Sequence, residues 1–454
     1  MKVMETRALQ RQETFRIAVA SLAGTAIEFY DFYIYGTAAA LVIGPVFFPA
    51  ASATSQALNA FLTFGIAFLA RPLGSALFGH FGDRVGRKAT LVASLLVMGI
   101  STTLIGVLPG FDSLGTAAPA ILCMLRFGQG IGLGGEWGGA ALLATESAPA
   151  GRKAWFGMFP QLGPSIGFLF ANGLFLLLLS ALSDEQFKSW GWRLPFLASC
   201  PLVLIGLYVR MSLAETPAFA RAMATNRPVP VPLATLIRRY WRTLLQGSLS
   251  IVVCYTLFYI STVFALSYGV SALHIPKESF LLLLCVAILF MALATPLSAL
   301  LADGFGRRPV LLAGSATAAL LGFQLPNLLG SGSTLGVLVF LILALYLMGL
   351  NFAPLGALLP ELFPTRVRYT GAAVAYNLGG ILGASLAPYA AQRLVSEGGL
   401  TWVGYYVSAA AIVSFLSILS MRETINEDLL IFDLESGGAA CDSRSQAEKE
   451  GGKR

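Results

Sequence analysis

Twelve long apolar runs follow one another along this chain of 454 residues. A helix needs about 20 mostly apolar residues to cross the hydrocarbon core of a bilayer. Lipid offers no partners to backbone N–H and C=O groups, so continuous runs favour helices, and their lack of alternation argues against a β-barrel. The sequence therefore predicts an all-α membrane protein with twelve transmembrane helices in two six-helix bundles. The runs cover residues 17–41, 57–79, 89–109, 117–143, 155–180, 193–212, 244–268, 280–302, 309–329, 335–358, 370–394 and 401–421.

Composition agrees with a bilayer as the solvent. Hydrophobic residues make up 56% of the chain and charged residues 12%, against roughly 25% charged in soluble domains. The net charge of +7 does not indicate nucleic-acid binding, because the basic residues lie in short loops between apolar runs. Neither the five cysteines nor His80 and His274 have the spacing of metal ligands. We expect no metal, no cofactor and no catalytic constellation.

Loop charges predict the orientation. An even number of spans puts both termini on one side of the membrane, and most of the 30 Lys and Arg residues fall on that side. The loops and helix ends on the other side hold only Lys188, Arg193, Lys277 and Arg393. Positive charge is enriched in cytoplasmic loops, so both termini are predicted to be cytoplasmic.

The runs divide the chain into five parts. We expect a cytoplasmic N-terminus at 1–16 without a cleavable signal, bundles at 17–212 and 244–421, a linker at 213–243, and a disordered tail at 422–454. The basic stretch Ile237–Arg242 in the linker either lies on the anionic inner leaflet or ends a solvated linker.

Three matches in the same order indicate that the two bundles are repeats. Gly82–Lys88 after the second span resembles Ala302–Arg308 after the eighth, 220 residues later. Glu146–Pro149 matches Glu361–Pro364 in the same way. In the fifth and eleventh spans, small residues four apart form one face for close helix packing: Gly163, Gly167, Ala171 and Gly379, Gly383, Ala387. Repeated halves of this kind place a solute site at mid-membrane and rock about it.

These motifs resemble the major facilitator superfamily, and more closely its metabolite:proton symporters. The carrying segments are Gly79–Lys88, Arg126–Gly132, Ile27–Phe32, Arg71–Gly74, Gly134–Gly139 and Pro360–Arg366. One departure is Gly304, where the second loop copy lacks an arginine. The resemblance implies alternating access and a solute among dicarboxylates, tricarboxylates, shikimate-like or aromatic acids, and osmolytes. Osmolyte carriers typically end in a coiled coil, and Glu423–Arg454 has no sustained heptads.

Ionisable groups within a bilayer are costly unless paired or hydrated, so each is a functional candidate. Counting about 1.5 Å per residue puts Glu28 and Arg71 in one layer, to which Glu136 returns, and Asp31 and Arg126 in a deeper one. The resemblance implies that Asp31 and Arg126 form a coupling pair. In that scheme a proton on Asp31 frees the arginine for an anionic solute, with Glu28 and Glu136 as reserves. The alternative is a static ion network that fixes helix packing.

Polar residues at mid-span supply further candidates for solute binding. Tyr35, Tyr255 and Tyr259 lie in the first and seventh spans, which are equivalent in the two halves. Asn351 and Asn377 lie within the second half. Each of the five either binds solute, together with Arg71 and Arg126, or packs and bonds against another helix.

Charges at the cytoplasmic helix ends form a separate group. The resemblance implies a gate that bridges the halves in one state and separates in the other. Ordinary loop charges explain the arginines but not the repeated acids. The candidate gate residues are Asp83, Arg84, Arg87, Glu146, Asp303, Arg307, Glu361 and Arg366. A match to the dinucleotide fingerprint at Gly130, Gly132 and Gly135 lies inside a span, where close helix contact is the better interpretation.

Taken together, the sequence predicts a monomeric inner-membrane symporter that moves a proton with a small organic anion. Uptake of a zwitterionic osmolyte, drug–proton antiport, sodium coupling and a nutrient sensor that has lost transport remain open. The sequence does not identify the solute.

Overall fold

A computed structural model describes residues 2–85, 87–146, 148–149, 151–212, 232–364 and 367–425. Within these residues the secondary structure is entirely helical. Ten apolar helical stretches are long enough to cross a membrane, and one of them, Arg368–Leu419, contains two spans that turn at Gly399 with φ 74°. The shorter apolar helix Val92–Val107 supplies the remaining span. The twelve predicted spans are confirmed.

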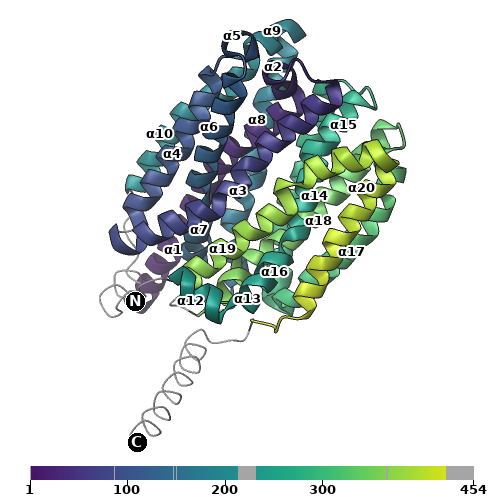
Figure 1. Cartoon of the computed structure of the whole chain (residues 1–454). Helices are drawn as coiled ribbons and strands as arrows, with labels where there is room; N and C mark the ends of the chain where they lie inside the picture. Colours follow the sequence, from purple (N-terminus) through teal and green to yellow (C-terminus); the bar gives the residue numbers. More distant parts are fainter. Residues whose placement is uncertain are drawn as a thin grey trace, which may run out of the picture.

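The first half holds six spans, drawn from purple to blue in Figure 1. The short helix η2 (Gly191–Arg193) follows α9 (Asp184–Ser189), and α9 and α5 (Phe111–Leu114) lie at the end that is uppermost in Figure 1. We call this the upper end. The helices that form the spans are α1 (Lys2–Ala38), η1 (Ala39–Ile43), α2 (Gly44–Phe47), α3 (Ala53–Val85), α4 (Arg87–Val107), α6 (Ala117–Gly134), α7 (Trp137–Glu146), α8 (Lys153–Ala181) and α10 (Leu194–Ser212).

The second half repeats this plan and lies beside the first. Its short α12 (Pro232–Arg239) lies at the opposite end of the molecule, which we call the lower end (Figure 1). The spans are formed by α13 (Trp241–Ser250), α14 (Val252–Tyr259), η3 (Ile260–Phe264), α15 (Ala265–Ser271), α16 (Lys277–Phe305), α17 (Arg307–Leu329), α18 (Thr334–Glu361), α19 (Arg368–Gly380), η4 (Ile381–Ser385) and α20 (Ala387–Leu419).

Equivalent helices of the two halves pack in the same way. An added Cβ on Gly167 of α8 would lie 2.6 Å from the Ala26 carbonyl oxygen of α1. One on Gly383 of η4 would lie 2.6 Å from the Val252 carbonyl oxygen of α14. The predicted small faces of the fifth and eleventh spans therefore allow close approach of the first and seventh spans. The first and seventh spans also share a π-helical turn, at η1 and η3.

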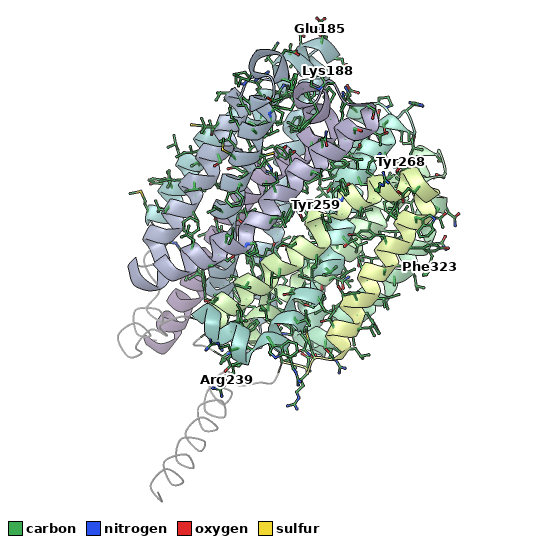
Figure 2. The ribbon with its side chains drawn as sticks, in the orientation of Figure 1. Glu185, Lys188, Arg239, Tyr259, Tyr268 and Phe323 are labelled. Carbon is green, nitrogen blue, oxygen red and sulfur yellow. The ribbon has the colours of Figure 1, made fainter. Side chains whose placement is uncertain are left out.

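The outer and inner faces of the spans differ as a bilayer requires. Leu293, Leu297 and Leu300 recur along one exposed face of α16, while every residue of α14 and η3 is buried between other helices. Figure 2 shows Phe323 at the outer surface and Tyr259 in the middle of the molecule. Exposed leucine faces suit contact with lipid, and the buried seventh span lines the seam between the halves.

Candidate functional site

Arg71 of α3 lies at the centre of this seam. Its side chain is 1% exposed, and its guanidinium carbon lies 4.4 Å from the ring centre of Phe32 and 4.3 Å from that of Phe68. Cation–π contact stabilises a positive charge between two such rings. The guanidinium acts electrostatically on four tyrosines that come from both halves: Tyr33, Tyr255, Tyr259 and Tyr376.

These tyrosines belong to a continuous aromatic cluster that crosses the seam. Tyr259 of α14 packs at 5.2 Å against Phe64 of α3, measured between ring centres. Tyr255 lies 6.3 Å from Tyr259 and 5.5 Å from Tyr376 of α19. Rings pack at little cost in side-chain entropy, so the cluster gives the centre of the protein rigid and mostly apolar walls.

Two buried nitrogens in this cluster, Nε and Nη2 of Arg71, make no hydrogen bond in the described part of the chain. The buried hydroxyls of Tyr255 and Tyr376 interact with each other. Buried polar groups in proteins are almost always hydrogen-bonded, either to protein or to something bound. The free edge of Arg71, with the tyrosine pair of the other half beside Phe68, is therefore a candidate contact for a solute.

Glu28 belongs to the same region. It is 1% exposed and acts electrostatically on Tyr33 and Tyr376, two of the tyrosines on which Arg71 also acts. Glu28 and Arg71 therefore act on the same part of the seam. Glu136, in the break between α6 and α7, is 2% exposed. Both acids interact with the surrounding protein.

Asp31 and Arg126 are joined indirectly. The Gln129 amide donates to the Asp31 main-chain oxygen at 2.8 Å and to Thr102 Oγ1 at 2.8 Å, and its Oε1 accepts a bond from Arg126. The other two guanidinium nitrogens donate to main-chain oxygens, Nε to Thr63 at 3.4 Å and Nη2 to Phe64 at 3.1 Å. All three nitrogens of Arg126 therefore have protein partners.

The direct ion pair implied by the resemblance is therefore absent from this conformation. The Asp31 carboxylate is fully buried, and its neighbour among the described side chains is the Ser199 hydroxyl rather than Arg126. Arg126 faces the Tyr35 ring instead, 3.8 Å from its centre. The geometry gives Arg126 another partner, because Gln129 lies one helical turn away and accepts a hydrogen bond from its guanidinium.

The other predicted solute contacts divide into two groups. Tyr35 shares a hydrogen bond with Thr63 Oγ1 at 2.6 Å, and Asn351 bonds Ser315 at 3.1 Å and the Leu347 carbonyl at 2.8 Å. These bonds fit the alternative in which the residues hold helices together. Tyr255 and Tyr259 lie in the aromatic cluster beside Arg71.

Asn377 bridges the two halves. From α19 its amide donates to Ser75 Oγ of α3 at 2.6 Å and to the Gly134 carbonyl of α6 at 3.3 Å. These groups are already bonded to protein, so Asn377 acts in this conformation as a contact between halves.

Four central residues were not among the sequence candidates: Gln129, Trp137, Gln161 and Tyr376. Trp137 of α7 stacks on Tyr376 with ring centres 3.8 Å apart and an angle of 7°. Its indole donates to Gln161 Oε1 at 3.0 Å, and Gln161 donates to the Phe352 carbonyl at 2.9 Å in the other half. Gln129 and Gln161 are uncharged amides within apolar runs, so a search for charged residues alone does not detect them.

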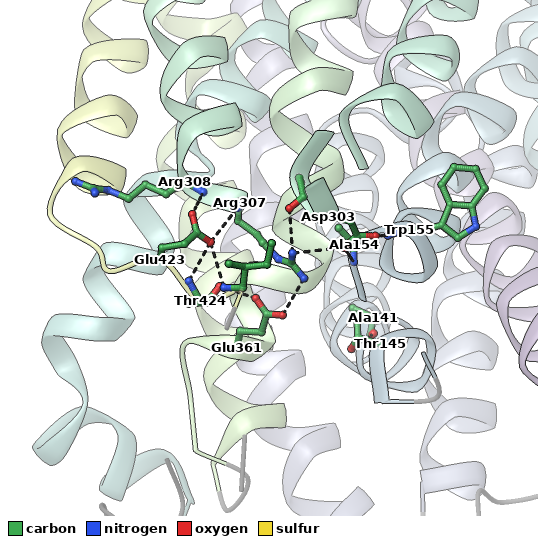
Figure 3. A network of polar contacts seen from close by, with 12 residues as sticks. Ala141, Thr145, Ala154, Trp155, Asp303, Arg307, Arg308, Glu361, Glu423 and Thr424 are labelled. Carbon is green, nitrogen blue, oxygen red and sulfur yellow. Dashed lines mark hydrogen bonds and ion pairs between the residues drawn. The ribbon is translucent and has the colours of Figure 1, made fainter. Parts of the chain in front are cut away.

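A second polar site closes the lower end (Figure 3). The Asp303 carboxylate of α16 accepts hydrogen bonds from the main-chain amides of Ala154 and Trp155, both at 2.9 Å. These amides belong to the first turn of α8, so a side chain of the second half caps a helix of the first. The cap is one of the links between the halves at this end.

Arg307 holds this acid in place. It lies 3.4 Å from Asp303 and 3.3 Å from Glu361, and all three side chains are largely buried. Thr424 donates to the other Glu361 oxygen at 2.6 Å. The carboxylate of Glu423 accepts bonds from the main-chain amides of residues 307 and 308 at 3.0 and 2.9 Å. Glu423 and Thr424, which follow α20, thus stabilise the network at the start of α17.

The remaining gate candidates are not brought into this network. The side chains of Asp83, Arg84 and Arg87, and residue Arg366, lie outside the described residues. Glu146 is exposed at the end of α7 and forms no ion pair with a described residue. Its counterpart in the repeat is the buried Glu361.

The upper end has a different link between halves. Asp184 of α9 contacts Lys277 at the start of α16 at 2.5 Å and Lys188 at 2.6 Å. The lysine groups bonded to it hold the pKa of Asp184 below its usual range. This ion pair is exposed, unlike the buried network at the lower end.

Two six-helix halves with a buried polar centre on their seam and links at both ends have the architecture of a membrane transporter. Residues 17–227 and 233–431 match the family described as "Sugar (and other) transporter". The chain belongs to this family of the major facilitator superfamily, and it is a metabolite transporter that crosses the membrane many times.

Curated relatives cover nearly the whole chain. It is 53% identical over 419 residues to "Inner membrane metabolite transport protein YhjE" of Escherichia coli K12, covering 91% of this chain and 95% of that one. It is 38% identical over 416 residues to the "Shikimate transporter" and 34% over 425 residues to the "Proline/betaine transporter" of the same organism. The alignments cover 90% and 91% of this chain, and 94% and 84% of those relatives.

A solved structure with the same fold is the proton:xylose symporter XylE bound to 6-bromo-6-deoxy-D-glucose. The TM-score is 0.72 at 17% identity, over 91% of this chain and 97% of that one. This likeness supports the fold.

Proposed function

We propose that the chain is a proton-coupled symporter that imports a small organic anion across the cell's inner membrane, as a monomer with both termini in the cytoplasm. The observation that carries this proposal is Arg71. It is a buried arginine on the seam between the halves, with two N–H groups that have no partner among the described residues. A positive charge at mid-membrane with unused donors suits a negatively charged solute.

Asp31 is the proton carrier in this proposal. An ionised carboxylate that is fully buried without a basic partner is costly, so the arrangement around Asp31, with the Ser199 hydroxyl as its neighbour, suits its protonated form. When the proton leaves, a negative charge develops on the Asp31 side chain, and Gln129, which donates to the Asp31 main-chain oxygen, also contacts Arg126. The direct pair of Asp31 and Arg126 then belongs to this deprotonated state.

Phe32 connects the proton site with the solute site. It follows Asp31 in α1, and its ring centre lies 5.3 Å from the Arg126 guanidinium carbon and 4.4 Å from that of Arg71. A movement of Arg126 toward Asp31 therefore displaces the ring that supports Arg71. Proton release and solute release are coupled through one aromatic side chain.

A second solute class has support of its own. Glu28 and Arg71 act on the same two tyrosines, Tyr33 and Tyr376, so both signs of charge surround the centre. This pattern also suits a zwitterion, in keeping with the relative named as a proline/betaine transporter.

Proteoliposomes test the proposal. Radiolabelled organic acids, proline and glycine betaine are offered with an inward proton gradient, with an inward sodium gradient, and without either. The proposal expects an organic acid to accumulate with the proton gradient alone and to lose accumulation when a protonophore is added. Accumulation driven by sodium alone, or the absence of both counterflow and accumulation for every acid, would contradict it.

A further inference from the structure

Arg71 offers one particular edge of its guanidinium. Nε and Nη2 are both buried and make no hydrogen bond within the described residues. These two N–H groups point in parallel from the same edge, and this edge binds both oxygens of a single carboxylate. The faces of the group are already covered by Phe32 and Phe68. Binding is therefore directed to the edge.

Two hydroxyl groups of the second half complete the set of donors. Tyr255 and Tyr376 have ring centres 5.5 Å apart, and the Tyr255 ring centre lies 6.2 Å from that of Phe68, which covers one face of Arg71. The two hydroxyls interact with each other, and because one donates to the other, at least one O–H remains available to a solute. A carboxylate has lone pairs for about four hydrogen bonds. One carboxylate thus has enough acceptor sites for the arginine edge and both tyrosines.

A second carboxylate on the solute has no comparable partner. Arg126 is the other arginine at mid-span, and each of its nitrogens already donates to protein. The charged neighbour that acts on the same tyrosines as Arg71 is Glu28, which would repel another negative group. The surrounding side chains are aromatic, and they suit a solute whose part beyond the carboxylate is weakly polar.

We propose that Arg71, Tyr255 and Tyr376 form a site for one carboxylate, and that the transported solutes are monocarboxylates rather than di- or tricarboxylates. This inference rests on the proposed function. The site takes donors from both halves, so a bound carboxylate also draws the halves together. Free organic acids with a ring and zwitterions such as betaines share this chemistry.

Competition at the purified full-length protein tests the proposal. Shikimate, benzoate and glycine betaine serve as monocarboxylate probes with different bodies, and binding is measured by isothermal titration calorimetry in nanodiscs. Shikimate methyl ester and benzamide remove the charge, and phthalate adds a second carboxylate to benzoate. Succinate and citrate complete the panel. We expect at least one monocarboxylate to bind about tenfold or more tightly than its uncharged analogue and than every di- or tricarboxylate.

Three variants assign the binding to this site. Arg71→Lys keeps the positive charge but removes the two parallel N–H donors of the guanidinium edge. We expect at least about a tenfold loss of monocarboxylate affinity. Tyr255→Phe and Tyr376→Phe each remove one hydroxyl and should weaken binding by about two- to tenfold. Arg393→Gln, at an exposed pair with Glu397, is the control and should not change binding.

The outcomes separate this inference from the proposed function. Tighter binding of succinate or citrate, with proton-driven uptake of the same compound, would overturn the single-carboxylate site and leave organic-anion symport standing. Unchanged affinity in Arg71→Lys would overturn the assignment to Arg71. Failure of all three monocarboxylates to bind also counts against the site. If benzoate or shikimate binds and glycine betaine does not, the carboxylate belongs to a free organic acid. If only glycine betaine binds, it belongs to a zwitterion.

Discussion

Trp137 and Tyr376 stack face to face across the two halves, with ring centres 3.8 Å apart. The pair is tied to a second contact between halves, because the Trp137 indole bonds Gln161 and Gln161 bonds the Phe352 carbonyl. Tyr376 is also one of the tyrosines beside Arg71. The stack therefore connects the central site with the packing of the halves below it.

Trp137→Ala should favour opening of the lower end. The variant loses a stacked aromatic pair, about 1 kcal/mol, and a hydrogen bond of similar value, and only the closed state makes both. The measurement is the distance between spin labels at Arg152 and Arg239, in a cysteine-free background. A broader, longer distance distribution is expected. Trp137→Phe, which can still stack, should shift it less, and equal distributions for all three proteins would show that the stack does not hold the halves together.

Asp303→Asn should open the same end more strongly. The substitution removes the charged cap from the first turn of α8 and leaves Arg307 with Glu361 as its remaining acidic partner. Loss of one member of a buried charged pair costs about 3–5 kcal/mol, although a neutral cap keeps part of the interaction. The same pair of labels reports the change. The matched control is Asp184→Asn, which weakens the upper end and should not lengthen the lower distance.

Asp31→Asn should separate proton coupling from solute binding. An amide cannot carry the proton, so accumulation driven by a pH gradient should be lost. Exchange of solute across the membrane without a gradient should persist, because Arg71 and the tyrosines are unchanged. Counterflow and gradient-driven uptake are compared in the same proteoliposomes, with Asp112→Asn on the exposed α5 as the control. Full accumulation by Asp31→Asn would refute the role of Asp31.

The spans and the repeat could be predicted because they depend on local chemistry. A run of about 20 apolar residues has few alternatives to a spanning helix. Glycines four residues apart can only line one face, and those of α8 and of the segment formed by α19 and η4 do pack against equivalent helices. The i, i+4 spacing likewise joins Asp303 to Arg307.

Pairing between helices could not be predicted in the same way. Depth along a helix follows from counting residues, and it placed Asp31 and Arg126 in the same layer. Rotation of each helix about its axis and the presence of Gln129 decided the actual contacts, and neither has a signature in a single sequence. The acceptor role of Asp303 was equally hidden, because its partners are main-chain amides of α8, 149 and 148 residues earlier.

The upper-end ion pair should be insensitive to pH across the physiological range. The ordinary pKa of Asp184 is 3.8, and Lys188 and Lys277 lower it further. A lowered pKa means that the ion pair contributes fully above 3.8 and is lost only as the pH falls through the lowered value. Spin labels at the exposed residues Glu185 and Thr334 should give one distance from about pH 8 to about pH 5. Salt near 1 M should lengthen it, because screening then acts within about 3 Å. A transition near neutral pH would assign the contact to another group.

Close packing of α3 on α6 should depend on Gly130. A Cβ at this position would lie 2.1 Å from the Ala67 carbonyl oxygen, so the helices cannot keep their distance with any larger residue. This contact also confirms that the glycines resembling a dinucleotide motif serve helix packing. Gly130→Ala should lower the melting temperature of the purified protein, in line with the about 1–3 kcal/mol that overpacking costs. Gly173→Ala is the matched control in α8, since a Cβ there meets nothing within 4 Å, and it should melt no lower than the parent. Equal losses at both positions would mean that backbone effects of glycine, rather than contact with α3, govern the stability of these spans.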